Sequence, residues 1–151
     1  MNLHAGHIEI AVASLLNYRV YTIVPNVSWG LDLRHECDML ALDPKGRFTE
    51  IEIKTTLSDL KADFKKKHEH RSSIISRLVY AVPESLREKA LEMIPNYTGL
   101  ISVSEAGYPK ARWIRQARHK VIKKPDQKTI QKFYELGCMR IWSLKKHNYK
   151  I

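Results

Sequence analysis

The sequence predicts an α/β protein with a mixed β-sheet, helices on both faces of that sheet and an additional basic helix at the C-terminus. Two observations support this prediction. Apolar runs of strand length alternate along the chain with amphipathic runs of helix length, an order typical of a mixed sheet that is covered on both faces. In addition, residues 36–42 and 50–54 alternate polar and apolar side chains on either side of a short turn, which predicts a central hairpin.

The elements are expected in a regular order along the chain. Helices are expected at 4–17, 56–67, 84–93 and 126–146, and strands at 20–24, 36–42, 50–54, 77–82, 99–103 and 110–114. Pro25 and Asn26 are expected to end the first strand, and an apolar stripe marks the last helix. We expect a single domain over residues 1–151, with a core of about 4–116 followed by a basic connector and helix over about 117–151.

The turn between the two arms of the hairpin sets their register. Pro44 suits the first corner of a type I turn and Gly46 readily takes a left-handed conformation, so residues 44–46 predict a three-residue loop with a glycine bulge. Asp43 then pairs with Arg47. Residues two apart share a face of the sheet. One face is expected to carry Glu36, Asp38, Glu50, Glu52 and Lys54, and the other Met39 or Cys37 together with Ile51 and Ile53.

Asp38 and Glu52 face each other in this register and predict a divalent-cation site, because opposed carboxylates repel unless a cation lies between them. Oxygen ligands of this kind suit Mg²⁺, for which Mn²⁺ can substitute. Lys54 can position a metal-bound water or offset the charge of a phosphate. The set is suited to hydrolysis of a phosphodiester, although an isolated Glu-x-Lys pair is also common on solvated strands.

At these residues the sequence resembles the PD-(D/E)xK nuclease superfamily, and more closely the MmcB-type DNA-repair endonucleases. The matching segments are residues 37–42, 51–56, 60–63, 77–83 and 99–101. The order and spacing of these segments match the family from about residue 20 to residue 107. Cys37 replaces the proline of the superfamily motif, and residues after about 118 have no counterpart.

This resemblance implies a restriction-endonuclease-like fold and Mg²⁺-dependent hydrolysis of DNA. It implies that Asp38, Glu52 and the carbonyl of Ile53 hold the metal, and that an acid of the first helix, here Glu9, joins them in metal binding and catalysis. Lys67 is then the basic residue of the second helix that points toward the site. Related nucleases often act as dimers, which leaves a homodimer open.

The formal net charge of +10 belongs entirely to the last third of the chain. Residues 1–103 hold 13 Lys or Arg and 13 Asp or Glu, whereas residues 104–151 hold 13 Lys or Arg and only 3 Asp or Glu. This distribution predicts contact with a nucleic acid, although a solvated basic face is the alternative. The resemblance implies that the nucleic acid is DNA rather than RNA. The residues expected to bind it are Arg112, Arg115, Arg118, Lys120, Lys123 and Lys124.

The remaining composition favours a cytoplasmic protein. Cys37 and Cys138 match no zinc or redox spacing, which predicts reduced thiols. The sequence has neither a signal-peptide pattern nor an apolar run long enough to span a bilayer, so we expect no membrane contact.

Three alternatives to a DNA nuclease remain open from the sequence. One is a module of the same fold that binds nucleic acid without cleaving it, and another is a nuclease directed at RNA. The third is a small-molecule enzyme or an interaction domain that uses its basic face for an acidic protein, since fold alone does not determine function.

Overall fold

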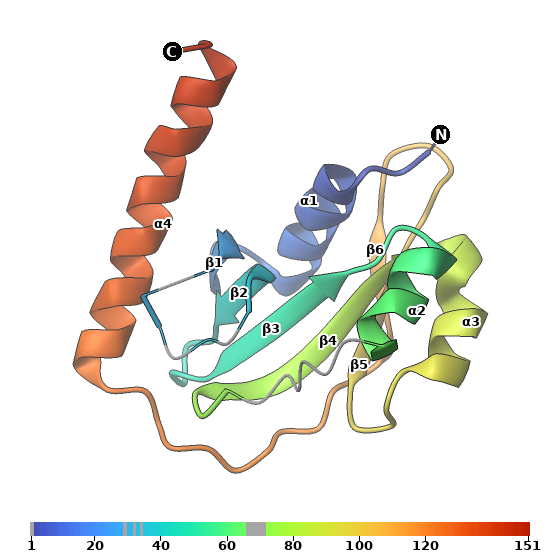
Figure 1. Cartoon of the computed structure of the whole chain (residues 1–151), viewed down its shortest axis with the longest axis horizontal. Helices are drawn as coiled ribbons and strands as arrows, with labels where there is room; N and C mark the ends of the chain where they lie inside the picture. Colours follow the sequence, from blue (N-terminus) through green and yellow to red (C-terminus); the bar gives the residue numbers. More distant parts are fainter. Residues whose placement is uncertain (1, 29, 32, 34, 66–71) are drawn as a thin grey trace.

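A six-stranded sheet in the order β1-β2-β3-β4-β5-β6 forms the centre of the molecule (Figure 1). This computed structural model describes residues 2–28, 30–31, 33, 35–65 and 72–151. The strands are β1 (Thr22–Val27), β2 (Cys37–Leu42), β3 (Phe48–Ile53), β4 (Ile75–Pro83), β5 (Gly99–Val103) and β6 (Ala111–Arg115). The helices are α1 (Ala5–Leu16), α2 (Leu57–Lys65), α3 (Arg87–Met93), which follows a 3-10 turn (Glu84–Leu86), and α4 (Gln127–Asn148). Because β3, β4 and β5 run parallel and the outer pairs antiparallel, the predicted mixed sheet is confirmed.

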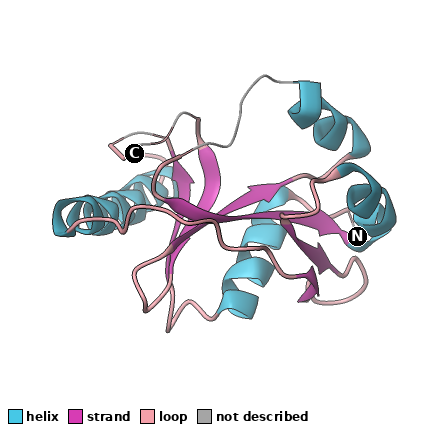
Figure 2. Ribbon diagram, turned by 90° about the horizontal axis from the view of Figure 1, so that it is seen from below, coloured by secondary structure: helices cyan, strands magenta, loops and turns pink. Residues whose placement is uncertain are grey.

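Helices cover both faces of the sheet, as the sequence predicted (Figure 2). On one face, Ile8 of α1 packs in a cluster with Ile51 of β3. On the other, Leu60 of α2 and Ala90 of α3 pack with Tyr80 of β4. Two successive right-handed crossovers between adjacent parallel strands place α2 and α3 on the same face. This arrangement leaves the other face to α1.

The central hairpin has the predicted loop and register. Asp43 N donates to Arg47 O at 3.0 Å, and Gly46 takes a left-handed φ of 80°. Met39 pairs with Ile51, in the register that places Asp38 opposite Glu52. The Asp43 carboxylate also accepts hydrogen bonds from the backbone and side chain of Arg47, at 3.0 and 2.8 Å. Burial acts in the opposite direction, but these bonds lower the pKa of Asp43 and so stabilise the turn in its ionised form.

The first strand differs from the prediction because it continues through Pro25 to Val27. Pro25 pairs with Met39, and Val27 pairs with Cys37. Proline cannot donate to a neighbouring strand, but β1 lies at the edge of the sheet, where one side of the backbone has no partner. Asn26 takes a left-handed φ of 52° within this strand, a conformation that asparagine tolerates better than most residues.

Helix α4 packs on the sheet chiefly through its first half. It begins where the Asp126 side chain accepts a hydrogen bond from Thr129 N at 2.8 Å, an N-cap. Phe133 is fully buried and meets the ring of Phe48 edge-on, with centroids 5.0 Å apart. Further along, Trp142 is 65% exposed, so the stripe predicted from the sequence does not enter the core over its whole length. None of the helices in the described part of the chain has both the length and the apolar character needed to cross a bilayer.

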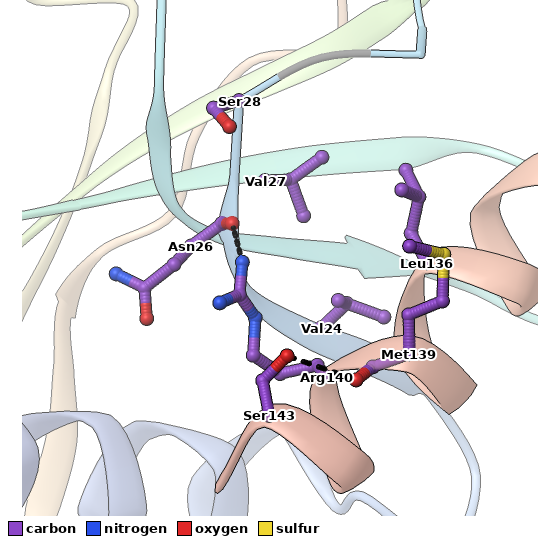
Figure 3. A pocket seen from close by; sticks show the side chains of 8 residues that line it. All are labelled: Val24, Asn26, Val27, Ser28, Leu136, Met139, Arg140 and Ser143. Atoms are coloured by element: carbon purple, nitrogen blue, oxygen red, sulfur yellow. Dashed lines mark hydrogen bonds between the residues drawn. The ribbon is translucent and has the colours of Figure 1, made fainter. Parts of the chain in front are cut away.

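A groove of about 230 Å³ separates β1 from the middle of α4 (Figure 3). Val24 and Val27 line its strand side, and Leu136 and Met139 its helix side. Arg140 crosses the groove and donates a hydrogen bond to the carbonyl oxygen of Asn26. This bond satisfies a carbonyl at the left-handed position of the edge strand and ties α4 to β1.

Candidate functional site

Asp38, Glu52 and Lys54 meet where β2 begins and β3 ends. The Asp38 carboxylate accepts a hydrogen bond from the backbone N–H of Ile53 at 2.7 Å. Lys54 Nζ lies 3.2 Å from Glu52 Oε2. The three residues come together because the hairpin turn fixes which positions of the two strands are opposite each other.

Asp63 of α2 completes the surroundings of the lysine. Lys54 Nζ lies 3.1 Å from Asp63 Oδ1, and the Tyr80 hydroxyl donates to Asp63 Oδ2 at 2.9 Å. Burial of Lys54 opposes its charge, but the carboxylates of Glu52 and Asp63 outweigh that effect and raise its pKa. Lys54 is therefore an ammonium ion at neutral pH, able to orient a water or a phosphate oxygen but not to act as a base.

The acids of the site share a common electrostatic environment. Burial raises the pKa values of Asp38 and Glu52. Burial and then the charge of Asp38 raise the pKa of Glu9. The structure thus gathers Asp38, Glu52 and Lys54 at one end of the sheet and leaves Glu9 of α1 within the electrostatic reach of Asp38, whereas Glu36 is exposed.

Two further residues, Glu50 and His35, lie beside Glu52. Glu50 is fully buried, and His35 Nε2 donates a hydrogen bond to Glu50 Oε1. The same nitrogen lies 3.6 Å from Glu52 Oε1. Contacts with Cys37, Glu50 and Glu52 raise the pKa of His35 to about 12, so His35 is a cation in this environment.

Among the residues that the structure describes, carboxylates outnumber cationic side chains at this end of the sheet. Among the described residues, the cationic side chains that form ion pairs with the site acids are His35 and Lys54. The carboxylates that interact with these cations or with one another are those of Glu9, Asp38, Glu50, Glu52 and Asp63. An excess of partly buried carboxylates favours divalent cations. The oxygens suited to hold them come from Asp38, Glu52 and Glu9, with the Ile53 carbonyl at the same strand end.

Two of the residues expected to bind nucleic acid take part in contacts within the fold. Arg112 Nη2 donates to Glu84 Oε1 at 2.7 Å. Arg115 donates to the carbonyl oxygens of Thr98 and Pro95, at 2.9 and 2.8 Å. Arg115 therefore holds the loop between α3 and β5, a role that the sequence did not indicate. Lys67 lies outside the described residues.

The other basic residues lie on the connector between β6 and α4, which follows the opposite end of the sheet. Lys120 N donates to Ser76 O at 2.9 Å, near the start of β4. Lys120 and Lys124 line a groove of about 390 Å³ with Lys45 and Arg47 of the hairpin turn. Since the turn precedes β3 and Lys54 follows it, the basic groove and the acidic site are separated by one strand length, about 20 Å. Arg118 lines a neighbouring groove of about 270 Å³, and Lys123 is exposed on the same connector.

A mixed sheet with helices on both faces, and an acidic site at the end of its central hairpin, is consistent with a restriction-endonuclease-like α/β fold. The family model "DNA repair protein MmcB-like" matches residues 3–148. The chain therefore belongs to the MmcB-like family of DNA repair proteins. A solved structure, the SPO1766 protein of unknown function from Silicibacter pomeroyi, is similar with a TM-score of 0.70 and 25% sequence identity. The similarity covers 98% of this chain and 96% of that one. A search of curated proteins gave no match.

Proposed function

We propose that this protein is a metal-dependent nuclease that hydrolyses DNA phosphodiester bonds during DNA repair. The observation that carries the proposal is that Asp38, Glu52 and Lys54 meet at one strand end, where the carboxylates of Glu52 and Asp63 keep the lysine charged. Membership of a family of DNA repair proteins supports DNA as the substrate class. The basic groove along the connector would add affinity that depends on salt and not on base sequence.

Each residue of the site has a distinct role in this proposal. Asp38 and Glu52, with Glu9 and the Ile53 carbonyl, would hold Mg²⁺ or Mn²⁺, which acidifies a bound water and offsets charge on the phosphate. Lys54 would hold the attacking water or a phosphate oxygen through its ammonium group. Asp63 fixes the position of Lys54, and Tyr80 fixes the position of Asp63.

Cleavage of labelled DNA tests this proposal directly. Single-stranded, duplex, flap and mismatched substrates are incubated with the wild-type protein, with Mg²⁺, with Mn²⁺ and with EDTA. We expect cleavage only with metal, and a loss of at least about 100-fold in Asp38→Asn, because a neutral amide binds the cation poorly. Glu92→Gln, which changes an exposed acid of α3, is the matched control and should cleave like the wild type.

The alternatives give different results in the same assay. A nuclease directed at RNA would cut labelled RNA faster than DNA of the same sequence. A module that only binds nucleic acid would retain all substrates uncut, with equal affinity in the wild type and in Asp38→Asn. Either result would overturn the proposed DNA nuclease.

Metal is expected to stabilise the fold more at pH 8 than at pH 5. Burial raises the pKa values of Asp38, Glu52 and Glu9, so the folded chain binds more protons than the unfolded chain between the ordinary and the raised values. Without metal, the free energy of unfolding therefore falls as pH rises through that window. A cation at ten times its Kd contributes about 1.4 kcal/mol, which raises Tm by roughly 3–6 °C. Protons compete for the same oxygens at pH 5 and reduce the shift.

Thermal melts with and without Mg²⁺ at the two pH values measure this difference. The same melts of Asp38→Asn should show little metal-dependent shift at either pH. An equal shift in wild type and variant would place the stabilising cation elsewhere on the protein.

A further inference from the structure

We infer that His35, Cys37 and Glu50 form a second metal site, one that takes a transition-metal ion of the zinc type and not Mg²⁺. One ligand atom from each of the three side chains lies within 4.8 Å of the other two. His35 comes from the segment before β2, Cys37 begins β2, and Glu50 lies in β3. The inference goes beyond the proposed nuclease and does not depend on it, because none of the three residues that define the site is a ligand of the proposed Mg²⁺ site; of the proposed Mg²⁺ ligands, Glu52 is the one that lies beside the cluster.

The ligand set determines which ion the site would prefer. It offers one imidazole nitrogen, one sulfur and one carboxylate oxygen, a combination that suits Zn²⁺ and does not suit the hard ions Mg²⁺ and Ca²⁺. Tetrahedral zinc has bonds of about 2.0–2.3 Å, which space its ligand atoms about 3.5 Å apart. Atoms that already lie within 4.8 Å need only small side-chain rotations to reach this spacing.

The three side chains of the cluster are largely buried, as the ligands of a metal site within a protein are. The side chains of Cys37 and Glu50 are fully buried, and that of His35 is 16% exposed. The hydrophobic cluster around Leu40 and Phe48 contains Cys37, so the sulfur is held in a dry environment. The paired strands β2 and β3 fix Cys37 and Glu50, and His35 approaches them from the segment before β2.

One carboxylate oxygen of Glu52, beside this cluster, has no hydrogen-bond partner among the described residues. Its Oε1 atom is buried and makes no hydrogen bond within the described part of the chain, although it lies 3.6 Å from His35 Nε2. Three protein ligands leave the fourth position of a tetrahedral ion open. Glu52 Oε1 is placed to fill that position, directly or through a water.

The competing occupant of this cluster is the proton. Zn²⁺ binds cysteine as the thiolate and histidine as the neutral imidazole, so the thiol proton and one imidazole proton compete with it. Binding of Zn²⁺ would displace both protons, so the affinity should increase with pH.

Zinc titration of the untagged full-length protein tests the inference. The chain is stripped with EDTA and dialysed, and Zn²⁺ is then added in competition with a chromophoric chelator. We expect one Zn²⁺ per chain, with affinity reduced by more than about 100-fold in Cys37→Ser and in His35→Gln. Co²⁺ in place of Zn²⁺ should give a thiolate-to-metal charge-transfer band that disappears in Cys37→Ser.

Two control variants make the result specific to this cluster. Cys138→Ser removes the exposed cysteine of α4 and should bind Zn²⁺ like the wild type. Asp38→Asn changes the proposed Mg²⁺ site and should also retain Zn²⁺. Circular dichroism of the two cluster variants shows whether they are folded, and Glu50→Gln provides a third variant if either is not.

The inference is overturned if the wild type binds Zn²⁺ no better than a folded cluster variant, or if Cys138→Ser loses as much affinity as Cys37→Ser. Failure of this site and failure of the proposed nuclease are distinguishable, because zinc stoichiometry is measured without DNA. A protein that binds one Zn²⁺ and cuts no substrate supports this site and contradicts the nuclease.

Discussion

Lys54→Ala is expected to slow DNA cleavage by about 10²–10⁴-fold and to change metal affinity little. Lys54 Nζ lies 3.2 Å from Glu52 and 3.1 Å from Asp63, so its charge lies beside the proposed cation site without being a ligand. Its loss removes the group proposed to hold the attacking water or the phosphate, whereas the oxygens that bind the metal remain. Single-turnover cleavage rates and calorimetric titration with Mn²⁺ measure the two effects separately.

Two further variants serve as a surface control and as a test of what positions Lys54. Lys89→Ala removes an exposed lysine that pairs with Glu92 on α3 and should leave both measurements unchanged. Asp63→Asn retains the shape of the side chain but removes a charge that holds Lys54. If Asp63 positions Lys54, the variant should lower the maximal rate more than it raises KM. Unchanged cleavage in Lys54→Ala would exclude the proposed role of this lysine.

Phe133→Ala is expected to destabilise the protein by about 3–5 kcal/mol. The side chain is fully buried, and its ring meets Phe48 edge-on at 5.0 Å. Helix α4 packs on the sheet chiefly through this side chain and its partly buried neighbours Ile130 and Leu136. Truncation therefore leaves a cavity at the contact that holds the helix. Urea unfolding measures the change, and Tm should fall by roughly 6–20 °C.

Trp142→Ala is the matched control for the second half of the same helix. Trp142 is 65% exposed, so its removal should change stability by no more than about 0.5 kcal/mol. A large loss of stability in Trp142→Ala, or almost none in Phe133→Ala, would contradict the way α4 packs in this structure.

The sequence predicted those parts of the site that depend on local rules. Pro44 and Gly46 define the turn, the turn defines the register, and the register places Asp38 opposite Glu52. The alternation of strands and helices likewise predicted a mixed sheet covered on both faces. These inferences hold because strand period and turn geometry are determined by neighbouring residues.

Features that depend on tertiary packing were not predicted. His35 lies in an irregular segment, so no periodicity linked it to Glu50. Asp63 could have been inferred in part, because it follows the buried Leu60 by three residues and so shares a face of α2. The apolar pattern of α4 indicated a buried stripe, but of its side chains Phe133 is the one that is buried, and Trp142 and Leu144 are exposed. An apolar stripe in the sequence shows which side of a helix is apolar, but it does not show how much of that side the sheet covers.

The separation between the basic connector and the acidic site bears on the length of DNA that could contact both. The two regions lie at opposite ends of β3, about 20 Å apart. Duplex DNA rises about 3.4 Å per base pair, so this distance corresponds to roughly six base-pair steps. An oligonucleotide shorter than that could occupy the acidic site or the connector, but it could not bridge them. In the proposed nuclease, lengthening the duplex beyond this span should therefore raise affinity for the DNA, because the connector can then bind it while the acidic site is occupied.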